Sequence, residues 1–240
     1  MADECFTDPV LAALYDPLDP DRSDLDAYLD MVREFGARRV LDVGCGTGVF
    51  ALLLADRGVE VTGVEPALAS LEVARGKPGG GRVRWVHGDA TVPLPVRADL
   101  VTMTANVAQA ITGPRDWELT LRHAFDALEP GGRLVFETRD PARRAWEEWT
   151  RERSWSVVEV AGTGPVESWV DLVEVALPLV TFRSTCVFAD GRVMTSDSTL
   201  RFRERDEIGE ALAAQGYVVD EVRDAPDRPG REFVFVARRP

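Results

Sequence analysis

The sequence is poor in the residues that build disulfide frameworks and metal sites. It has three cysteines and two histidines. Cys5, Cys45 and Cys186 lie far apart without a C-x-x-C pair. This spacing suits neither a disulfide framework nor a zinc site, and His87 and His123 cannot form a metal cluster alone. We therefore expect no bound metal.

Long apolar segments are also missing. No run approaches the roughly 18 apolar residues that indicate a membrane span, and the first residues, Met1-Ala2-Asp3-Glu4, are acidic and unlike a leader peptide. We expect a cytoplasmic protein that does not insert into a membrane.

Positive charge is scarce as well. Lys77 is the only lysine, and the formal net charge is −13. Proteins that grip phosphate backbones need a basic face, because counterion release supplies most of that affinity. A local patch such as Arg139, Arg143 and Arg144 is not excluded, but the balance argues against DNA or RNA as a partner.

The central part of the chain alternates short β-branched runs with amphipathic helices, which is typical of a parallel sheet covered on both faces. The pattern predicts strands over 40–43, 59–64, 83–86, 99–104 and 133–138, and helices over 50–55, 66–75 and 117–128. Glu129-Pro130-Gly131-Gly132 is expected to end the last helix. We predict a Rossmann-like doubly wound α/β sheet within one domain, residues 1–240.

Two flanking regions have a different character. Residues 1–36 are expected to form a helical lid, with Ser23 as N-cap of a helix that ends near Gly36. After a predicted helix over 141–152, residues 154–203 alternate with a period of two, and Asp190-Gly191 is a hairpin signal. We expect an antiparallel insertion over 154–203. A helix over 206–215 and strands over 217–222 and 232–237 follow.

The strongest functional signal is the loop after the first predicted strand, which carries Gly44, Gly46 and Gly48. The first of these glycines stands two residues after Asp42. Glycines let a ligand approach the backbone closely, and the helix that follows presents free N–H groups. In an open α/β sheet this loop lies at the ligand-binding edge.

Glu65 ends the second predicted strand, where a carboxylate can accept hydrogen bonds from a ribose diol. Nicotinamide proteins use the same device. Their loop follows G-x-G-x-x-G, however, whereas Val49 stands here at the place of the third glycine. Dinucleotide binding is therefore the weaker interpretation.

The segment Leu41-Asp42-Val43-Gly44-Cys45-Gly46-Thr47-Gly48 resembles the first motif of class I methyltransferases that use S-adenosylmethionine. Weaker similarity continues through Val64-Glu65-Pro66, His87-Gly88-Asp89-Ala90, Asp99-Leu100-Val101 and Leu128-Glu129-Pro130-Gly131-Gly132. The resemblance implies a seven-stranded sheet with a reversed C-terminal hairpin and the insertion between strands five and six. It also implies S-adenosylmethionine as cofactor and S-adenosylhomocysteine as product.

The resemblance further implies roles for individual residues. Asp42 and the backbone of Gly44, Cys45, Gly46, Thr47 and Gly48 would hold the methionine end. Glu65 would bind the ribose hydroxyls, followed by Pro66, which lacks a backbone donor. Asp89 and the Ala90 amide would face the adenine, and Asn106 and Val107 would lie near the sulfonium.

Simpler roles compete with these. Asp42 and Asp89 could bond only to loop amides, and for Asn106 the two roles are evenly balanced. The histidines suit structural roles better, although His87 is kept as a weak catalytic candidate. Tyr15 could close over the cofactor, and Arg139 could bind an anionic acceptor or pair with an acid. The tryptophans of the insertion fit a core or dimer contact better than a pocket wall.

The sequence does not identify a catalytic base. The N/D-P-P-Y/F motif of amino-methylating nucleic-acid enzymes is absent, and Thr104-Ala105-Asn106 offers no carboxylates for a metal-dependent catechol site. We expect a methyl transfer to N or O of a small molecule, in a natural-product or sugar-like context, by a chain that could form a homodimer. The insertion resembles those of sugar N-methyltransferases. A noncatalytic cofactor-binding subunit and a nicotinamide oxidoreductase remain alternatives.

Overall fold

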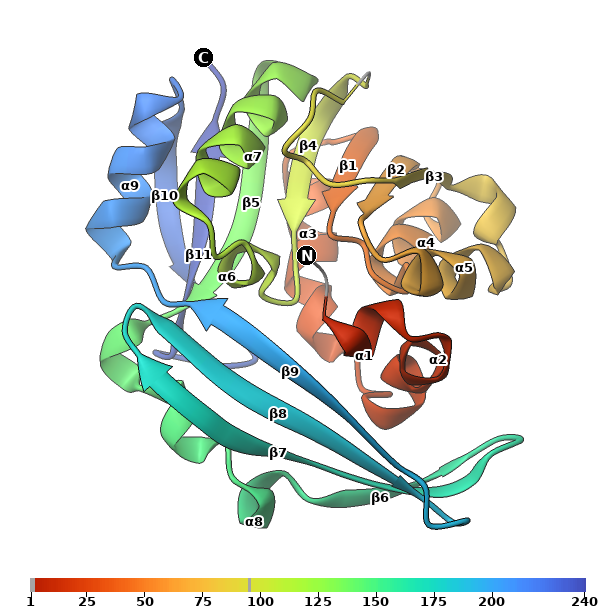
Figure 1. Cartoon of the computed structure of the whole chain (residues 1–240). Helices are drawn as coiled ribbons and strands as arrows, with labels where there is room; N and C mark the ends of the chain where they lie inside the picture. The colour runs from red at the N-terminus through yellow and green to blue at the C-terminus, as the bar shows by residue number, and fades with distance from the viewer. Residues whose placement is uncertain (1–2, 95) are drawn as a thin grey trace.

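A seven-stranded sheet organises the computed structural model, which describes residues 3–94 and 96–240 (Figure 1). Its strand order is β3-β2-β1-β4-β5-β11-β10. The strands are β1 Arg39–Val43, β2 Glu60–Glu65, β3 Arg84–His87, β4 Ala98–Met103, β5 Leu128–Arg139, β10 Val218–Asp224 and β11 Glu232–Arg238. Strands β1 to β5 are parallel, and β11 runs antiparallel to β5 and β10. The predicted Rossmann-like sheet with its reversed hairpin is confirmed.

Helices cover both faces of this sheet, because its strands carry apolar side chains on both faces. On one face, Val40 and Val61 pack beneath α3 (Asp26–Glu34) and α4 (Val49–Asp56). On the other face, Leu41, Phe136 and Phe235 pack beneath α7 (Pro114–Ala127) and α9 (Arg205–Ala214). The helices are α1 Glu4–Thr7, α2 Pro9–Leu18, α3 Asp26–Glu34, α4 Val49–Asp56, α5 Leu68–Gly76, α6 Val107–Ala110, α7 Pro114–Ala127, α8 Arg151–Ser154 and α9 Arg205–Ala214, with 3-10 turns η1 Ser23–Leu25, η2 Gly80–Arg82, η3 Pro141–Arg143 and η4 Ala145–Glu148.

The predicted insertion forms a separate antiparallel sheet in the order β6-β7-β8-β9. Its strands are β6 Ser156–Val160, β7 Gly164–Ala176, β8 Leu179–Phe188 and β9 Val193–Arg201. The expected hairpin at Asp190-Gly191 joins β8 to β9. Val166 and Phe188 pack against Leu11 and Leu14 of α2, so the N-terminal helices lie between the insertion and the main sheet (Figure 1).

The helix predicted over 141–152 is wrong. The segment contains η3, η4 and the beginning of α8, and Arg144 at φ +47° separates the two 3-10 turns. Trp146 is buried, and its ring centroid lies 4.6 Å from that of Phe202. Packing of the tryptophan against the insertion thus overrides the weak helical pattern, as tertiary contacts commonly do.

Two other local predictions also need correction. Ser23 does not cap α3: it lies in η1, its backbone N–H donates to Asp21 Oδ1 at 3.0 Å, and α3 begins at Asp26. Residues 129–132 follow the end of α7 at Ala127, as predicted, but the strand expected over 133–138 begins earlier, at Leu128, and contains them; its pairing with β4 shifts register there. Gly131 donates its N–H to the Arg239 carbonyl at 2.8 Å, so a backbone contact from the C-terminal segment supports the irregular strand.

Among the described residues, no helix has the length and apolar character needed to cross a membrane.

Candidate active site

The loop between β1 and α4 has the backbone that its glycines predict. Gly44, Gly46 and Gly48 have φ values of +70°, +52° and +79°, a region that side chains disfavour. A Cβ at Gly44 would come within 2.5 Å of Val107, and one at Gly48 within 2.5 Å of Trp85. Close packing therefore requires glycine at the first and third positions. At Gly46 the requirement comes from φ, because a Cβ would meet nothing within 4 Å.

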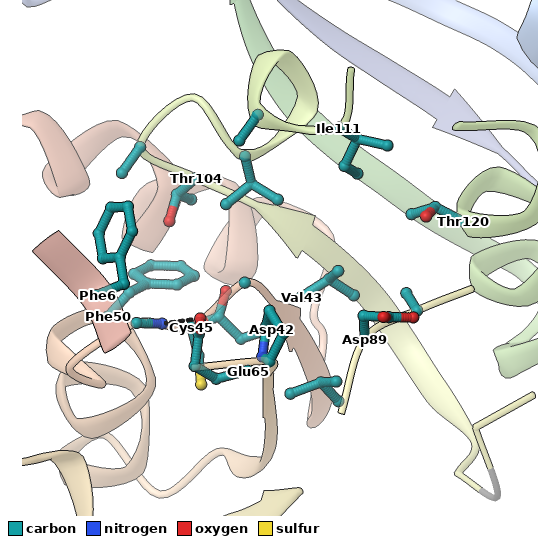
Figure 2. A pocket seen from close by; sticks show the side chains of 18 of the residues that line it. Phe6, Asp42, Val43, Cys45, Phe50, Glu65, Asp89, Thr104, Ile111 and Thr120 are labelled. Carbon is teal, nitrogen blue, oxygen red and sulfur yellow. Dashed lines mark hydrogen bonds between the residues drawn. The ribbon is translucent and has the colours of Figure 1, made fainter. Parts of the chain in front are cut away.

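A cavity of about 290 Å³ opens above this loop, at the carboxyl ends of the parallel strands (Figure 2). Of the twelve predicted cofactor residues, only Gly48 and Asn106 are not among the described residues that line it. The ten lining residues are Asp42, Gly44, Cys45, Gly46, Thr47, Glu65, Pro66, Asp89, Ala90 and Val107. The fold therefore gathers around one cavity most of the residues that the sequence motifs pick out.

Asp42 has an unpaired, buried oxygen at this cavity. Its side chain is 1% exposed, and Oδ1 accepts a hydrogen bond from Thr102 Oγ1 at 3.0 Å. Oδ2 has no partner among the described residues. Burial raises the pKa of Asp42 to about 7, and Glu65 and Glu137 add to the rise. A buried acceptor without a donor is costly, so this atom suits a ligand that brings an N–H group.

Glu65 shapes the loop from the end of β2. Its Oε2 accepts the Gly46 N–H at 2.9 Å, and Oε1 accepts the Ala67 N–H at 2.8 Å. Burial raises the pKa of Glu65, although the two N–H groups oppose the rise. Each carboxylate oxygen has a second lone pair, so Glu65 keeps the capacity to bind hydroxyl groups while it orders the loop.

Asp89 makes a turn contact and also lies at the cavity. Its Oδ1 accepts the Thr91 N–H at 2.8 Å, which is a turn-capping contact, and the residue also lines the cavity. Asp89 lies with Ile111 and Thr120 on the opposite side of the cavity from Phe6 (Figure 2). The His123 Nδ1–H donates to the Ala90 carbonyl at 2.9 Å, which fits the structural role expected for it.

Of the three weak catalytic candidates, Tyr15 lines the cavity, whereas His87 and Arg139 are not among the described lining residues. His87 Nε2 contacts the Pro66 carbonyl at 3.1 Å. Arg139 donates to Gln109 Oε1 at 3.3 Å and lies 3.7 Å from Glu232. Burial lowers the pKa of Arg139 to about 10. The observed contacts of Arg139 are thus with protein groups beside the cavity.

The N-terminal segment contributes residues that the sequence motifs did not reveal. Asp3, Phe6 and Arg22 line the cavity with Tyr15, and the rings of Phe6 and Tyr15 lie 5.5 Å apart. Arg22 is the first basic residue of the chain and stands among aspartates, a signal that could have been noticed. Further lining residues, for which no cofactor role was predicted, are Val43, Val49, Phe50, Val64, Thr91, Thr104, Ala105, Ala110, Ile111, Thr112, Asp116 and Thr120.

Comparison with known proteins identifies the family of the chain. Residues 18–222 match the family model described as a methyltransferase domain. The chain belongs to the class I S-adenosylmethionine-dependent methyltransferases.

Similar proteins share either the core or the whole fold. The mitochondrial ubiquinone biosynthesis O-methyltransferase of Schizosaccharomyces pombe is 32% identical over 123 residues, which cover 48% of this chain and 43% of the relative. The chain thus matches about half the length of the curated relatives. The CcbJ methyltransferase of Streptomyces caelestis is 26% identical, with a TM-score of 0.76 over 95% and 96% of the two chains. An amino pentose methyltransferase from Micromonospora echinaspora, involved in calicheamicin biosynthesis, is 26% identical, with a TM-score of 0.71 over 96% and 97%.

The cofactor is S-adenosylmethionine, and the residues present fit it. The unpaired Asp42 oxygen and the glycine backbone offer a cradle beside Glu65. The family assignment favours methyl transfer over the hydride transfer and the noncatalytic role that the sequence left open.

Proposed function

We propose that this chain transfers a methyl group from S-adenosylmethionine to an N or O atom of a small, sugar-like or natural-product acceptor. The observation that carries the proposal is the shape of the cavity. It extends from the glycine loop to Asp3, Phe6 and Tyr15 of the N-terminal segment, so residues 3–36 serve as a lid over a chamber suited to a small molecule; residues 1 and 2 of the predicted lid lie outside the described residues.

The insertion over 154–203 supports the lid. The Cys5 N–H donates to Ser196 Oγ at 2.8 Å, which ties α1 to β9. On the core side, Ser70 Oγ donates to the Phe6 carbonyl at 3.0 Å. The lid is therefore attached to the insertion sheet through β9 and to the main domain through helix α5. The likeness to the amino pentose methyltransferase covers nearly all of both chains, which supports a role for the insertion in enclosing an acceptor.

The binding roles follow from the cavity contacts. Asp42 Oδ2 would accept from the methionine ammonium group, the backbone of Gly44 to Thr47 would face the methionine end, and Arg22 would face its carboxylate. Glu65 would bind the ribose hydroxyls. Asp89 and Ala90 would face the adenine. Asn106 and Val107 follow β4, next to the part of the cavity wall that Thr104 and Ala105 form.

S-adenosylmethionine supplies an activated methyl group when bound, so the protein must chiefly align the acceptor with it. Such alignment can contribute roughly 7–11 kcal/mol to lowering the barrier. Tyr15 can hydrogen-bond an acceptor as a neutral phenol, because burial raises its pKa. The pKa of the Asp3 carboxyl is raised by burial too, which suits Asp3 to receive a proton from an acceptor amine or hydroxyl.

The proposal is tested by incubating the protein with S-adenosylmethionine and panels of amino sugars, hydroxylated sugars and phenols. We expect S-adenosylhomocysteine together with an acceptor whose mass rises by one methylene unit. We also expect a large loss of turnover in Tyr15→Phe and in Asp3→Asn, because the proposal places both groups on the acceptor. Tight cofactor binding without methylation of any panel member would contradict the proposed acceptor class.

A further inference from the structure

The turn that follows β4 is held in an unfavourable backbone conformation. Ala105 and Asn106 have φ values of +56° and +65°. Two consecutive non-glycine residues in this region each cost on the order of 1–3 kcal/mol. Such a turn persists only where its surroundings impose it.

This turn forms one wall of the cavity. Thr104, Ala105 and Val107 line it, and Thr104 lies near Phe6 and Phe50 in Figure 2. Val107 packs so closely on the glycine loop that a Cβ at Gly44 would overlap it. The position of the turn therefore determines where this wall of the cavity lies and how closely Val107 packs on the glycine loop.

Glu137 of β5 anchors the turn from behind. Its Oε1 accepts the Asn106 N–H at 2.5 Å, and its Oε2 accepts the Tyr28 O–H at 2.5 Å. Glu137 is 3% exposed and is not among the described lining residues. Its effect on the cavity is therefore indirect, through the turn that it holds and through Tyr28.

Tyr28 fixes the other end of this anchor. It lies on α3, is 7% exposed, and packs edge-on against Phe50 with ring centroids 6.3 Å apart. Phe50 itself lines the cavity. The carboxylate of Glu137 is thus clamped between a helix on one face of the sheet and the strained turn.

We propose that Glu137 is a positioning residue for methyl transfer, which holds the Ala105–Asn106 turn in its left-handed conformation and so fixes the wall where acceptor and cofactor meet. This inference rests on the proposed function.

Stability alone does not account for a carboxylate at this position. Burial raises the pKa of Glu137 to about 7, and Glu232 adds to the rise, so the carboxyl group is only partly ionised at neutral pH. An ionised carboxylate, however, accepts both donors strongly. A neutral side chain at this position would cost less desolvation when the protein folds, but it would accept the Asn106 N–H more weakly and so hold the turn less firmly.

The test compares Glu137→Gln with Glu137→Met, two replacements of similar shape. Glutamine keeps an acceptor for the Asn106 N–H, whereas methionine keeps none. We expect kcat to fall modestly in the glutamine variant and roughly 10- to 100-fold in the methionine variant, since small misplacements have effects of this size. The KM for S-adenosylmethionine should change much less. At pH 8 the glutamine variant should unfold at no lower a temperature than the wild type.

A second change separates positioning from a general structural effect. Ala105→Gly accepts the left-handed conformation without strain, so the loss of kcat caused by Glu137→Met should be several-fold smaller in an Ala105→Gly background. Equal losses in both backgrounds, or a methionine variant with wild-type kcat, would overturn the inference.

Amide exchange distinguishes this inference from the proposed function. The Asn106 N–H should exchange slowly in the wild type and in Glu137→Gln, and faster in Glu137→Met, whatever the acceptor. Fast exchange in the wild type would overturn the anchor even if methylation is observed. If the Asn106 N–H is protected but the chain methylates no acceptor, the anchor exists and the proposed function is wrong. The positioning role in methyl transfer is then wrong as well.

Discussion

Two buried carboxylates line the cavity and a third lies behind its wall, and each makes different contacts. Asp42 leaves an oxygen free, Glu65 orders the glycine loop, and Glu137 holds the turn after β4. Burial raises the pKa of all three. Their proximity destabilises the ligand-free protein, and a ligand that carries an ammonium group and hydroxyls relieves part of that cost.

Asp42→Asn should separate binding from folding. The Asn amide can still accept from Thr102, but it places N–H groups where Oδ2 offers a lone pair. We expect S-adenosylmethionine to bind about 10- to 100-fold more weakly, the value of a hydrogen bond to a charged group. Calorimetric titration measures this. Thr102→Val is the matched control, because it alters Oδ1 and leaves Oδ2 in place; equal affinity of Asp42→Asn and wild type would contradict the role.

The same variant should change how stability depends on pH. The folded pKa of Asp42, about 7, exceeds the unfolded value of 3.8, so its favourable contribution is present below pH 3.8 and is lost as the pH rises through 7. Relative to wild type, Asp42→Asn should therefore gain free energy of unfolding between pH 4 and 8, by at most about 4 kcal/mol. Urea denaturation at several pH values measures it. A constant difference across this range would refute the assignment.

At the residue scale, the sequence predicted the parts of the site that lie in contiguous motifs. The Asp42–Gly48 loop was predictable because its glycines respond to local backbone demands. The role proposed for Glu137 was not, because it depends on partners brought together by tertiary packing, as when Tyr28 and Asn106 meet one carboxylate.

A polar cluster connects the lid helix α2 to the glycine loop. Asp16 Oδ1 accepts from Thr47 Oγ1 at 2.6 Å, and Asp16 Oδ2 lies 2.5 Å from Lys77 Nζ. Lys77 also donates to the Thr47 carbonyl at 2.7 Å. The only lysine of the chain therefore joins α2, the loop and the end of α5.

Lys77→Met should loosen this connection. The pair is about a quarter exposed, and such pairs contribute about 0.2–1 kcal/mol, so S-adenosylmethionine should dissociate roughly two- to fivefold faster in stopped-flow measurements. Arg183→Met, which removes a pair with Asp197 on the insertion sheet, serves as control. Equal dissociation rates in the two variants would show that the cluster does not restrain the lid.

At the element scale, prediction succeeded where period and length agreed. The strands of the main sheet, the antiparallel character of the insertion and the hairpin at Asp190-Gly191 followed from alternation and turn chemistry. The helix over 141–152 failed because Trp146 finds its partner, Phe202, far along the chain. Helix α6 was missed because four residues carry too little periodicity to recognise.

At the scale of the whole molecule, the sheet order places the glycine loop, Glu65 and Asp89 at one edge, as expected of the fold. The sequence could not show that the N-terminal segment bridges the two sheets. That arrangement depends on contacts such as Cys5 with Ser196, which are 191 residues apart.

The central claim, that the glycine loop holds S-adenosylmethionine, is tested most directly by the unfolding midpoint of the protein with S-adenosylmethionine and, separately, with NADH. A ligand at about 100 times its dissociation constant adds roughly 2.7 kcal/mol, or about 5–11 °C for a chain of this size. We predict such a rise with S-adenosylmethionine, and its loss in Gly46→Arg, where φ is +52°. A shift with NADH and none with S-adenosylmethionine would contradict the account.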